Sequence, residues 1–207
     1  MTKIKSFDEF QPLALRTESH IDSVKTNKDL LTAVLSIQII SGEILDHLKK
    51  QIYYNNPTKL LENTEVNVQN LAGMVASLYE IAHNLSPDSL EDEIPVHPRV
   101  FHGMLGAITE TAEASEILLG GVNGKGIDKV HVQEEMVGDY NWYLAILTDA
   151  LELDYYRGLT NVINKLRVRY PQKYEDSLAT YRDWETDRKS TRLNSSHSAK
   201  SRMPSSA

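Results

Sequence analysis

Five long segments carry apolar residues at spacings of three and four positions, the pattern of an amphipathic helix. These segments are residues 27–53, 65–85, 99–119, 130–154 and 157–169. Helix boundary signals accompany them: Thr64 precedes the second segment, Pro98 precedes the third, and Gly120-Gly121 follows the third. Alternating apolar and polar positions of strand length are not evident in the sequence. The pattern therefore predicts an all-α fold, a helical bundle.

The predicted helices fall into two groups separated by a proline-containing segment. Residues 86–98, SPDSLEDEIPVHP, are acidic and hold three prolines, which predicts an exposed linker. The linker ends an N-terminal helical half, 1–98, and leads into a C-terminal helical half, 99–183. Residues 184–207 are rich in serine and poor in large apolar residues, and they show no helical or strand period. We expect 184–207 to be a disordered or artefactual tail.

Composition and charge narrow the classes of partner. The 207 residues include 22 Lys and Arg against 29 Asp and Glu, a net charge of −7, which argues against nonspecific binding to nucleic acid or to membrane surfaces. Cysteine is absent, which excludes disulfides and thiolate metal sites. No apolar run approaches the roughly 18 residues of a membrane span, and no signal peptide is evident at the start. We expect a cytoplasmic protein without nucleic-acid or membrane partners.

Pairs of carboxylates mark two of the predicted helices. Glu110 and Glu113 are three residues apart, so both side chains reach the same region beside the helix. They lie on a different face from the apolar stripe predicted to pack, which consists of Phe101, Met104, Leu105, Ile108 and Ala112. A solvated acidic surface is the alternative interpretation for this pair.

The second pair, Glu135 and Asp139, projects into the apolar stripe of its own helix, beside Trp142. Carboxylates on an apolar face are costly unless they are paired or bind a metal. The short connection between the two helices, which contains glycine, favours antiparallel packing, so the two pairs are expected to meet. Four oxygen ligands without cysteine suit Mg²⁺ or Mn²⁺, and Mg²⁺ commonly completes its shell with water and substrate phosphates. The sequence thus points to metal-assisted phosphate-ester or anhydride chemistry.

Three runs of residues, GMLGAITETAEASEIL, GKGIDKVHVQEEMVGDYNWYLA and NKLRVRYPQKY, resemble the MazG-like, all-α nucleoside triphosphate pyrophosphohydrolases. The N-terminal run FDEFQPLALRTES resembles the opening helix of phage-type members. The family's motifs, in chain order, match ExxE at Glu110 and Glu113, a glycine-lysine connection at Gly124, Lys125 and Asp128, EExxD at Glu134, Glu135 and Asp139, and a basic segment with Lys165 and Arg169.

The resemblance implies a MazG-type helical bundle that hydrolyses a nucleoside triphosphate to the monophosphate and pyrophosphate. Glu110, Glu113, Glu135 and Asp139 would hold Mg²⁺, and one of them would orient the attacking water. Lys165 and Arg169 would neutralise the triphosphate; the alternative is a pair of surface cations near a helix C-terminus. The resemblance also implies a homo-oligomer, a dimer or a tetramer. A catalytically degenerate member that binds nucleotides or a partner, and a helical scaffold with structural carboxylates, are the alternative functions.

The chain departs from the family motif at one place. Three residues separate Glu135 from Asp139, where the family has two. A regular helix tolerates the change because spacings of three and four share a face. A π-bulge that absorbs one residue is the other possibility. Both keep Glu135 and Asp139 as ligands and leave the role of Glu134 open.

The two halves also align with each other, which suggests a degenerate internal duplication of a helix hairpin. In this alignment Ile40 takes the place of Glu110, and Leu71 and Val75 take the places of Glu135 and Asp139. The N-terminal half would then be a copy that has lost its metal ligands. The alternative is that any two amphipathic hairpins share such matches.

Overall fold

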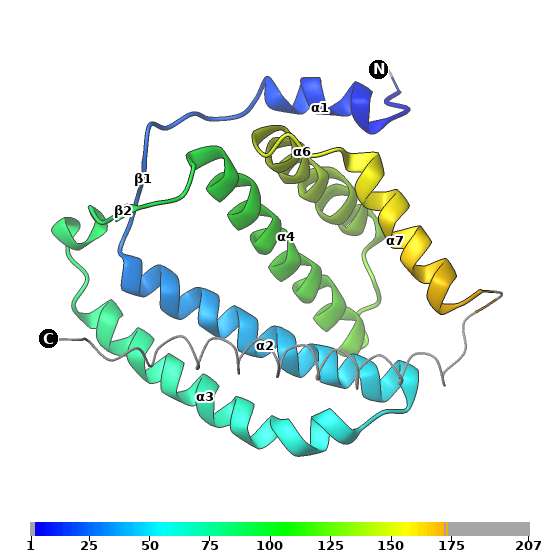
Figure 1. Cartoon of the computed structure of the whole chain (residues 1–207). Coiled ribbons are helices and arrows are strands. Elements are labelled where there is room, and N and C mark those ends of the chain that lie inside the picture. The colour runs from blue at the N-terminus through cyan, green and yellow to red at the C-terminus, as the bar shows by residue number, and fades with distance from the viewer. Residues whose placement is uncertain (1–2, 172, 174–207) are drawn as a thin grey trace, which may run out of the picture. The chain divides into compact units, whose positions relative to one another are not determined.

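The computed structural model describes residues 3–171 and 173, and these residues are mostly helical (Figure 1). The all-α class is therefore confirmed. The helices are α1 (Phe7–Leu15), α2 (Lys28–Tyr54), α3 (Thr58–His83), α4 (Pro98–Val122), α5 (Lys129–His131), the π-helix η2 (Val132–Asp139), α6 (Tyr140–Ala150) and α7 (Tyr155–Arg169). A 3₁₀ turn, η1 (Pro87–Leu90), and two short strands, β1 (Val24–Lys25) and β2 (Glu93–Ile94), complete the described elements.

The chain divides into two compact units. One unit contains residues 3–31 and 84–159, and the other contains residues 32–83 and the described residues from 160 onward. The first unit holds α1, both strands and the helices from α4 to α6. The expected halves, 1–98 and 99–183, and the hairpin duplication stay predictions. The expected tail, 184–207, lies outside the described residues.

Two local features differ from the sequence pattern. Helix α3 begins at Thr58 and not near residue 65. Pro57 immediately precedes the helix, and its carbonyl accepts a hydrogen bond from the Leu61 N–H at 2.9 Å, which forms the first helical turn. The segment 86–98, predicted as an exposed linker, is exposed at most positions, but its strand β2 pairs antiparallel with β1, with Val24 opposite Ile94. Both of these side chains are buried, so a short apolar contact holds the segment at this point.

Helix α1 is tied to α6 by polar side chains. Ser6 caps α1 by accepting the Glu9 N–H. The indole N–H of Trp142 donates to the Ala14 carbonyl at 3.1 Å and to the Thr17 hydroxyl at 2.9 Å. These bonds come from the end of α6 that adjoins η2, so they fix the position of α1 against the helix that leads out of the carboxylate-bearing segment.

A buried glutamate anchors the chain after α1. Glu18, whose side chain is 1% exposed, accepts two parallel hydrogen bonds of 2.9 Å from Arg99 at the start of α4. The same guanidinium donates to Asp149 near the end of α6 at 2.7 Å. These carboxylates raise the pKa of Arg99 far above its usual value. One charged side chain thus joins three segments, and the two-pronged geometry makes the pairing directional.

Helices α4 and α6 pack closely and antiparallel, through a face of α4 that carries glycine. Gly103 lies against Leu147 and the Tyr143 carbonyl, and Gly106 lies against the Tyr143 ring. The predicted packing stripe of α4 is therefore wrong in part: Met104 is 53% exposed, whereas Gly103, Gly106 and Glu110 are buried. The two helices approach closely because Gly103 and Gly106 have no side chains, and not because apolar side chains interlock there.

Helix α2 has a higher mean hydropathy than we expected from its sequence. An 18-residue window within it has a mean hydropathy of 1.3, and only 6% of that window is buried. By length and composition alone α2 is sufficient to cross a membrane, so the expectation that no segment qualifies is wrong. Near its C-terminal end α2 also carries Asp46, which pairs with Lys49 and Lys50. The absence of a membrane partner stays a prediction.

We expect Gly106→Ala to destabilise the protein by about 1–3 kcal/mol, because the added methyl would overlap the Tyr143 ring in a packed contact. Gly120→Ala is the matched control on the same helix. Its methyl would meet only the Gly126 carbonyl at 3.8 Å, so this variant should be neutral or slightly stabilised. Urea denaturation of both variants measures the difference, and equal stabilities would contradict the close approach of α4 and α6.

Candidate metal centre

Two neighbouring elements of the first unit supply four carboxylates. Glu110 and Glu113 come from α4, and Glu135 and Asp139 come from η2. One carboxylate oxygen each from Glu110, Glu135 and Asp139 lie within 4.8 Å of one another. Glu113 is close enough to Glu135 to raise its pKa. The structure thus brings all four predicted residues into one cluster, and their role as metal ligands stays a prediction.

The second acidic pair is carried by a π-helix. In η2 the backbone bonds reach five residues back, as in the bond from the Tyr140 N–H to the Glu135 carbonyl. A π-turn takes about one residue more than an α-turn, which accommodates the extra residue between Glu135 and Asp139. Of the two interpretations of this spacing, the π-bulge is confirmed. Glu134 is exposed and is not among the residues whose ligand atoms converge in the cluster with Glu135 and Asp139.

Glu110 is the buried member of the cluster. It is 5% exposed, and its Oε2 has no hydrogen-bond partner among the described residues. Burial, followed by the negative charges of Glu113, Asp139 and Glu135, raises the pKa of Glu110 above its ordinary value. A buried carboxylate oxygen without a partner is costly, and a divalent cation would supply the missing charge.

Loss of solvation and the negative charges of the cluster also raise the pKa values of Glu135 and Tyr143. Loss of solvation and then Glu113 raise the pKa of Glu135, while His131 acts in the opposite direction. Burial and then Glu110 raise the pKa of the Tyr143 hydroxyl. Tyr143 also contacts His102 edge-to-face, with ring centroids 5.7 Å apart. The Tyr143 ring of α6 therefore lies beside the cluster.

Sequence reasoning missed His131. Its Nε2 lies 3.4 Å from Oε1 of Glu135 and 3.7 Å from Oε2 of Glu113. Asp128 positions this residue, because its side chain caps α5 by accepting the Val130 and His131 N–H groups. The spacing of four between His131 and Glu135, which places both on one helical face, is the signal that could have identified it.

A cavity of about 510 Å³ adjoins His131. The loop after α4 forms one side of it and contributes Lys125, between Gly124 and Gly126. Both glycines have φ near +80°, at 77° and 79°, which explains why the tight turn contains glycine at these positions. Glu116 of α4 also lines the cavity. Lys125 thus lines the same cavity as the histidine that borders the carboxylates.

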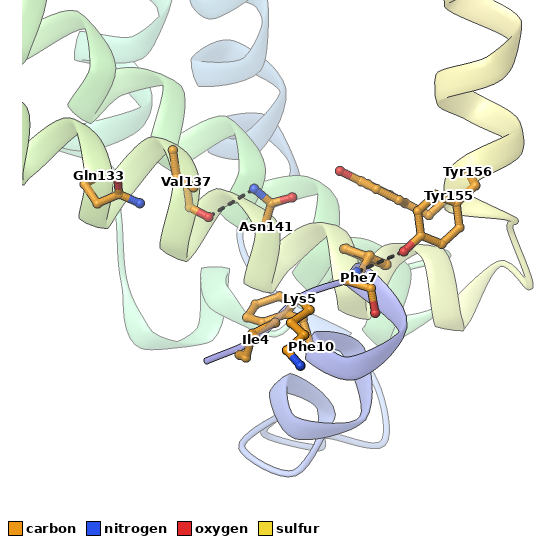
Figure 2. Close-up of a pocket in the computed structure, with 10 residues that line it drawn as sticks. Ile4, Lys5, Phe7, Phe10, Gln133, Val137, Asn141, Tyr155 and Tyr156 are labelled. Atoms are coloured by element: carbon orange, nitrogen blue, oxygen red, sulfur yellow. Dashed lines mark hydrogen bonds between the residues drawn. The ribbon is translucent and has the colours of Figure 1, made fainter. Parts of the chain in front are cut away.

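A second cavity, of about 760 Å³, lies on a different side of η2 (Figure 2). Gln133, Val137 and Asn141 line it from η2 and α6, and these residues alternate with Glu135 and Asp139 along the chain. Its aromatic wall includes Phe7, stacked on Tyr155 with ring centroids 3.8 Å apart. None of the four carboxylates lines this cavity.

The two predicted phosphate-binding residues lie on α7. Lys165 is exposed, and the Arg169 guanidinium lies over the Tyr170 ring, 5.7 Å from its centroid. Both residues belong to the other compact unit, not to the unit that holds the carboxylates. Their role in substrate binding stays a prediction.

Comparisons with protein-family models, curated proteins and solved structures found no match to this chain.

We expect the metal-free protein to lose stability as pH rises from the ordinary range of a glutamate through the higher pKa values that Glu110 and Glu135 have in the folded state. The raised pKa values of Glu110 and Glu135 mean that the folded state binds protons more tightly than the unfolded chain. Their contribution is thus present at low pH and lost as pH rises through the folded-state pKa. Denaturation in EDTA at several pH values should show a smaller loss for Glu110→Gln.

Glu116→Gln is the control for this measurement, since Glu116 is exposed on the same helix and outside the cluster. Its pH dependence should follow that of the wild type. Mg²⁺ should raise the wild-type melting temperature at about pH 8 and have less effect near pH 5, where protons compete for the carboxylates. An unchanged pH dependence in Glu110→Gln would contradict the assignment of the repulsion to this cluster.

Proposed function

We propose that the protein is a Mg²⁺-dependent nucleoside triphosphate pyrophosphohydrolase of the MazG-like type. The reaction would convert a nucleoside triphosphate and water to the nucleoside monophosphate and pyrophosphate. The observation that carries the proposal is the cluster of Glu110, Glu113, Glu135 and Asp139 on two facing helices, with a buried oxygen of Glu110 that lacks a hydrogen-bond partner within the described part of the chain. The order and spacing of the motifs supply the reaction class.

The negative charges of the four carboxylates explain why binding of a triphosphate would require a cation. Four carboxylates repel a triphosphate unless divalent cations lie between them and the phosphate oxygens. The residues present suit the group: all four donors are hard oxygens, and two of them have raised pKa values that a bound cation would lower. Bound Mg²⁺ would neutralise phosphate charge and promote ionisation of water. Glu110, Glu113, Glu135 and Asp139 would hold the cation, and one of them would accept the proton of the attacking water.

The cavity beside His131 supports a binding place for phosphate groups. Lys125 brings a positive charge to it, and the glycines on either side leave the backbone of the turn accessible. Lys165 and Arg169 remain our candidates for further charge neutralisation.

The oligomeric state is a further part of the proposal: we propose a homodimer or homotetramer in the cytoplasm. Large apolar side chains are exposed along α2 and α3, among them Ile39, Ile52, Leu61, Val75 and Tyr79. Exposed apolar side chains in such number are typical of surfaces that associate. We expect multi-angle light scattering to give a mass of two or four chains, and a monomer at micromolar concentration would contradict this part.

We expect pyrophosphate release from a panel of dNTPs and NTPs in the presence of Mg²⁺, and none in EDTA. Glu113→Gln should reduce the rate by at least about 100-fold, because it removes a proposed cation ligand without changing the side chain's size. Glu62→Gln is the matched control and should retain the wild-type rate, because Glu62 is exposed on α3 and belongs neither to the cluster nor to the lining of the two cavities.

The reaction products, together with metal and nucleotide binding, distinguish the proposed function from its alternatives. Orthophosphate in place of pyrophosphate would move the cleaved bond and contradict the proposed reaction. Binding of nucleotide and metal without turnover would indicate the degenerate binding protein. A folded protein that binds no cation would indicate a structural role for the carboxylates.

A further inference from the structure

Two groups of possible cation ligands overlap in the cluster. One consists of Glu110, Glu135 and Asp139, and the other consists of Glu113, His131 and Glu135. Within each group one ligand atom of every residue lies within 4.8 Å of the others. Glu135 belongs to both groups, and its two carboxylate oxygens allow it to bridge two cations. The second group differs from the first in having a nitrogen ligand.

The distances around His131 fit coordination better than a direct hydrogen bond. Its Nε2 lies 3.4 Å from Glu135 Oε1 and 3.7 Å from Glu113 Oε2, whereas N–H···O bonds are typically about 2.7–3.2 Å long. Two ligand atoms about 2.1 Å from one ion, at a tetrahedral angle, are about 3.4 Å apart. These two separations, together with the 4.8 Å limit on all three ligand atoms, are short enough for one cation to contact all three side chains.

A second observation comes from Glu110. Its side chain is buried, and its Oε2 has no hydrogen-bond partner among the described residues, although the other carboxylates of the cluster lie beside it. A positive charge between α4 and η2 would offset the cost of burying this oxygen without a partner. A cation on Glu110, Glu135 and Asp139 leaves an oxygen of Glu135 for a neighbouring cation on Glu113 and His131.

The nitrogen ligand changes which cation the second position prefers. Mg²⁺ is bound through oxygen ligands, whereas imidazole is a good ligand for transition-metal cations. We propose that Glu113, His131 and Glu135 form a second cation position that prefers a divalent transition-metal ion, with His131 Nε2 as a direct ligand. This inference rests on the proposed carboxylate centre, but it does not require that the protein hydrolyse nucleotides.

Mn²⁺ without nucleotide is the probe, because its electron spin reports directly on nitrogen ligands. Pulsed electron paramagnetic resonance of the Mn²⁺-loaded protein should show a nitrogen hyperfine coupling. The coupling should disappear in His131→Gln, and Mn²⁺ affinity at one of two sites should fall at least about tenfold. His97→Gln is the matched control, since His97 is exposed at the start of α4 and its side chain makes no capping bond.

The results of this experiment test the second cation position separately from the proposed pyrophosphohydrolase activity. A nitrogen coupling in the wild type and in His97→Gln, but not in a folded His131→Gln, supports the inference. Mn²⁺ bound without nitrogen coupling overturns it, and if Mg²⁺-dependent pyrophosphate release persists, the proposed function stands. No binding of Mn²⁺ or Mg²⁺ to the folded protein overturns both. Circular dichroism melting confirms that His131→Gln is folded in the comparison.

Discussion

The close approach of α4 to the helix formed by η2 and α6 is the constraint on which the carboxylate cluster depends. Gly103 and Gly106 let α4 lie directly against Tyr143 and Leu147, with no side chain between the backbones on the α4 side. Glu110 follows one turn after Gly106, so its carboxylate is buried where the two helices meet. A larger side chain at Gly106 would separate the helices and move Glu110 away from the carboxylates of η2.

This packing places like charges together, which costs stability in the absence of a cation. Burial and mutual repulsion raise the pKa values of Glu110 and Glu135, so the folded state favours their protonated forms. A polypeptide selected only for stability would place apolar side chains at these positions. The arrangement is therefore better explained by binding of positive charge than by packing, and the ion pair of Arg99 with Glu18 and Asp149 stabilises the helices that bear the cluster.

Apolar periodicity predicted the helices well, because a three- and four-residue repeat is a direct consequence of helical geometry. It failed on the buried face of α4, because glycine adds nothing to an apolar stripe, and Met104 proved to be exposed. The strand pair was missed because the buried contact involves only Val24 and Ile94, too few residues to form a pattern. The convergence of the four carboxylates was predicted from two pairs on consecutive helices, whereas no local pattern revealed the distances around His131.

The π-helix links these observations. A projection that assumes a constant angle per residue cannot follow a segment in which one turn takes an extra residue, so it left the role of Glu134 open while keeping Glu135 and Asp139 as ligands. In the structure, the added residue is accommodated within η2, and Glu135 and Asp139 still face Glu110. An insertion that rotated the rest of the helix would have removed Asp139 from the cluster or Tyr143 from Gly106. The structure keeps both contacts together with the irregular turn, so the same segment satisfies the packing of α6 and the convergence of the carboxylates.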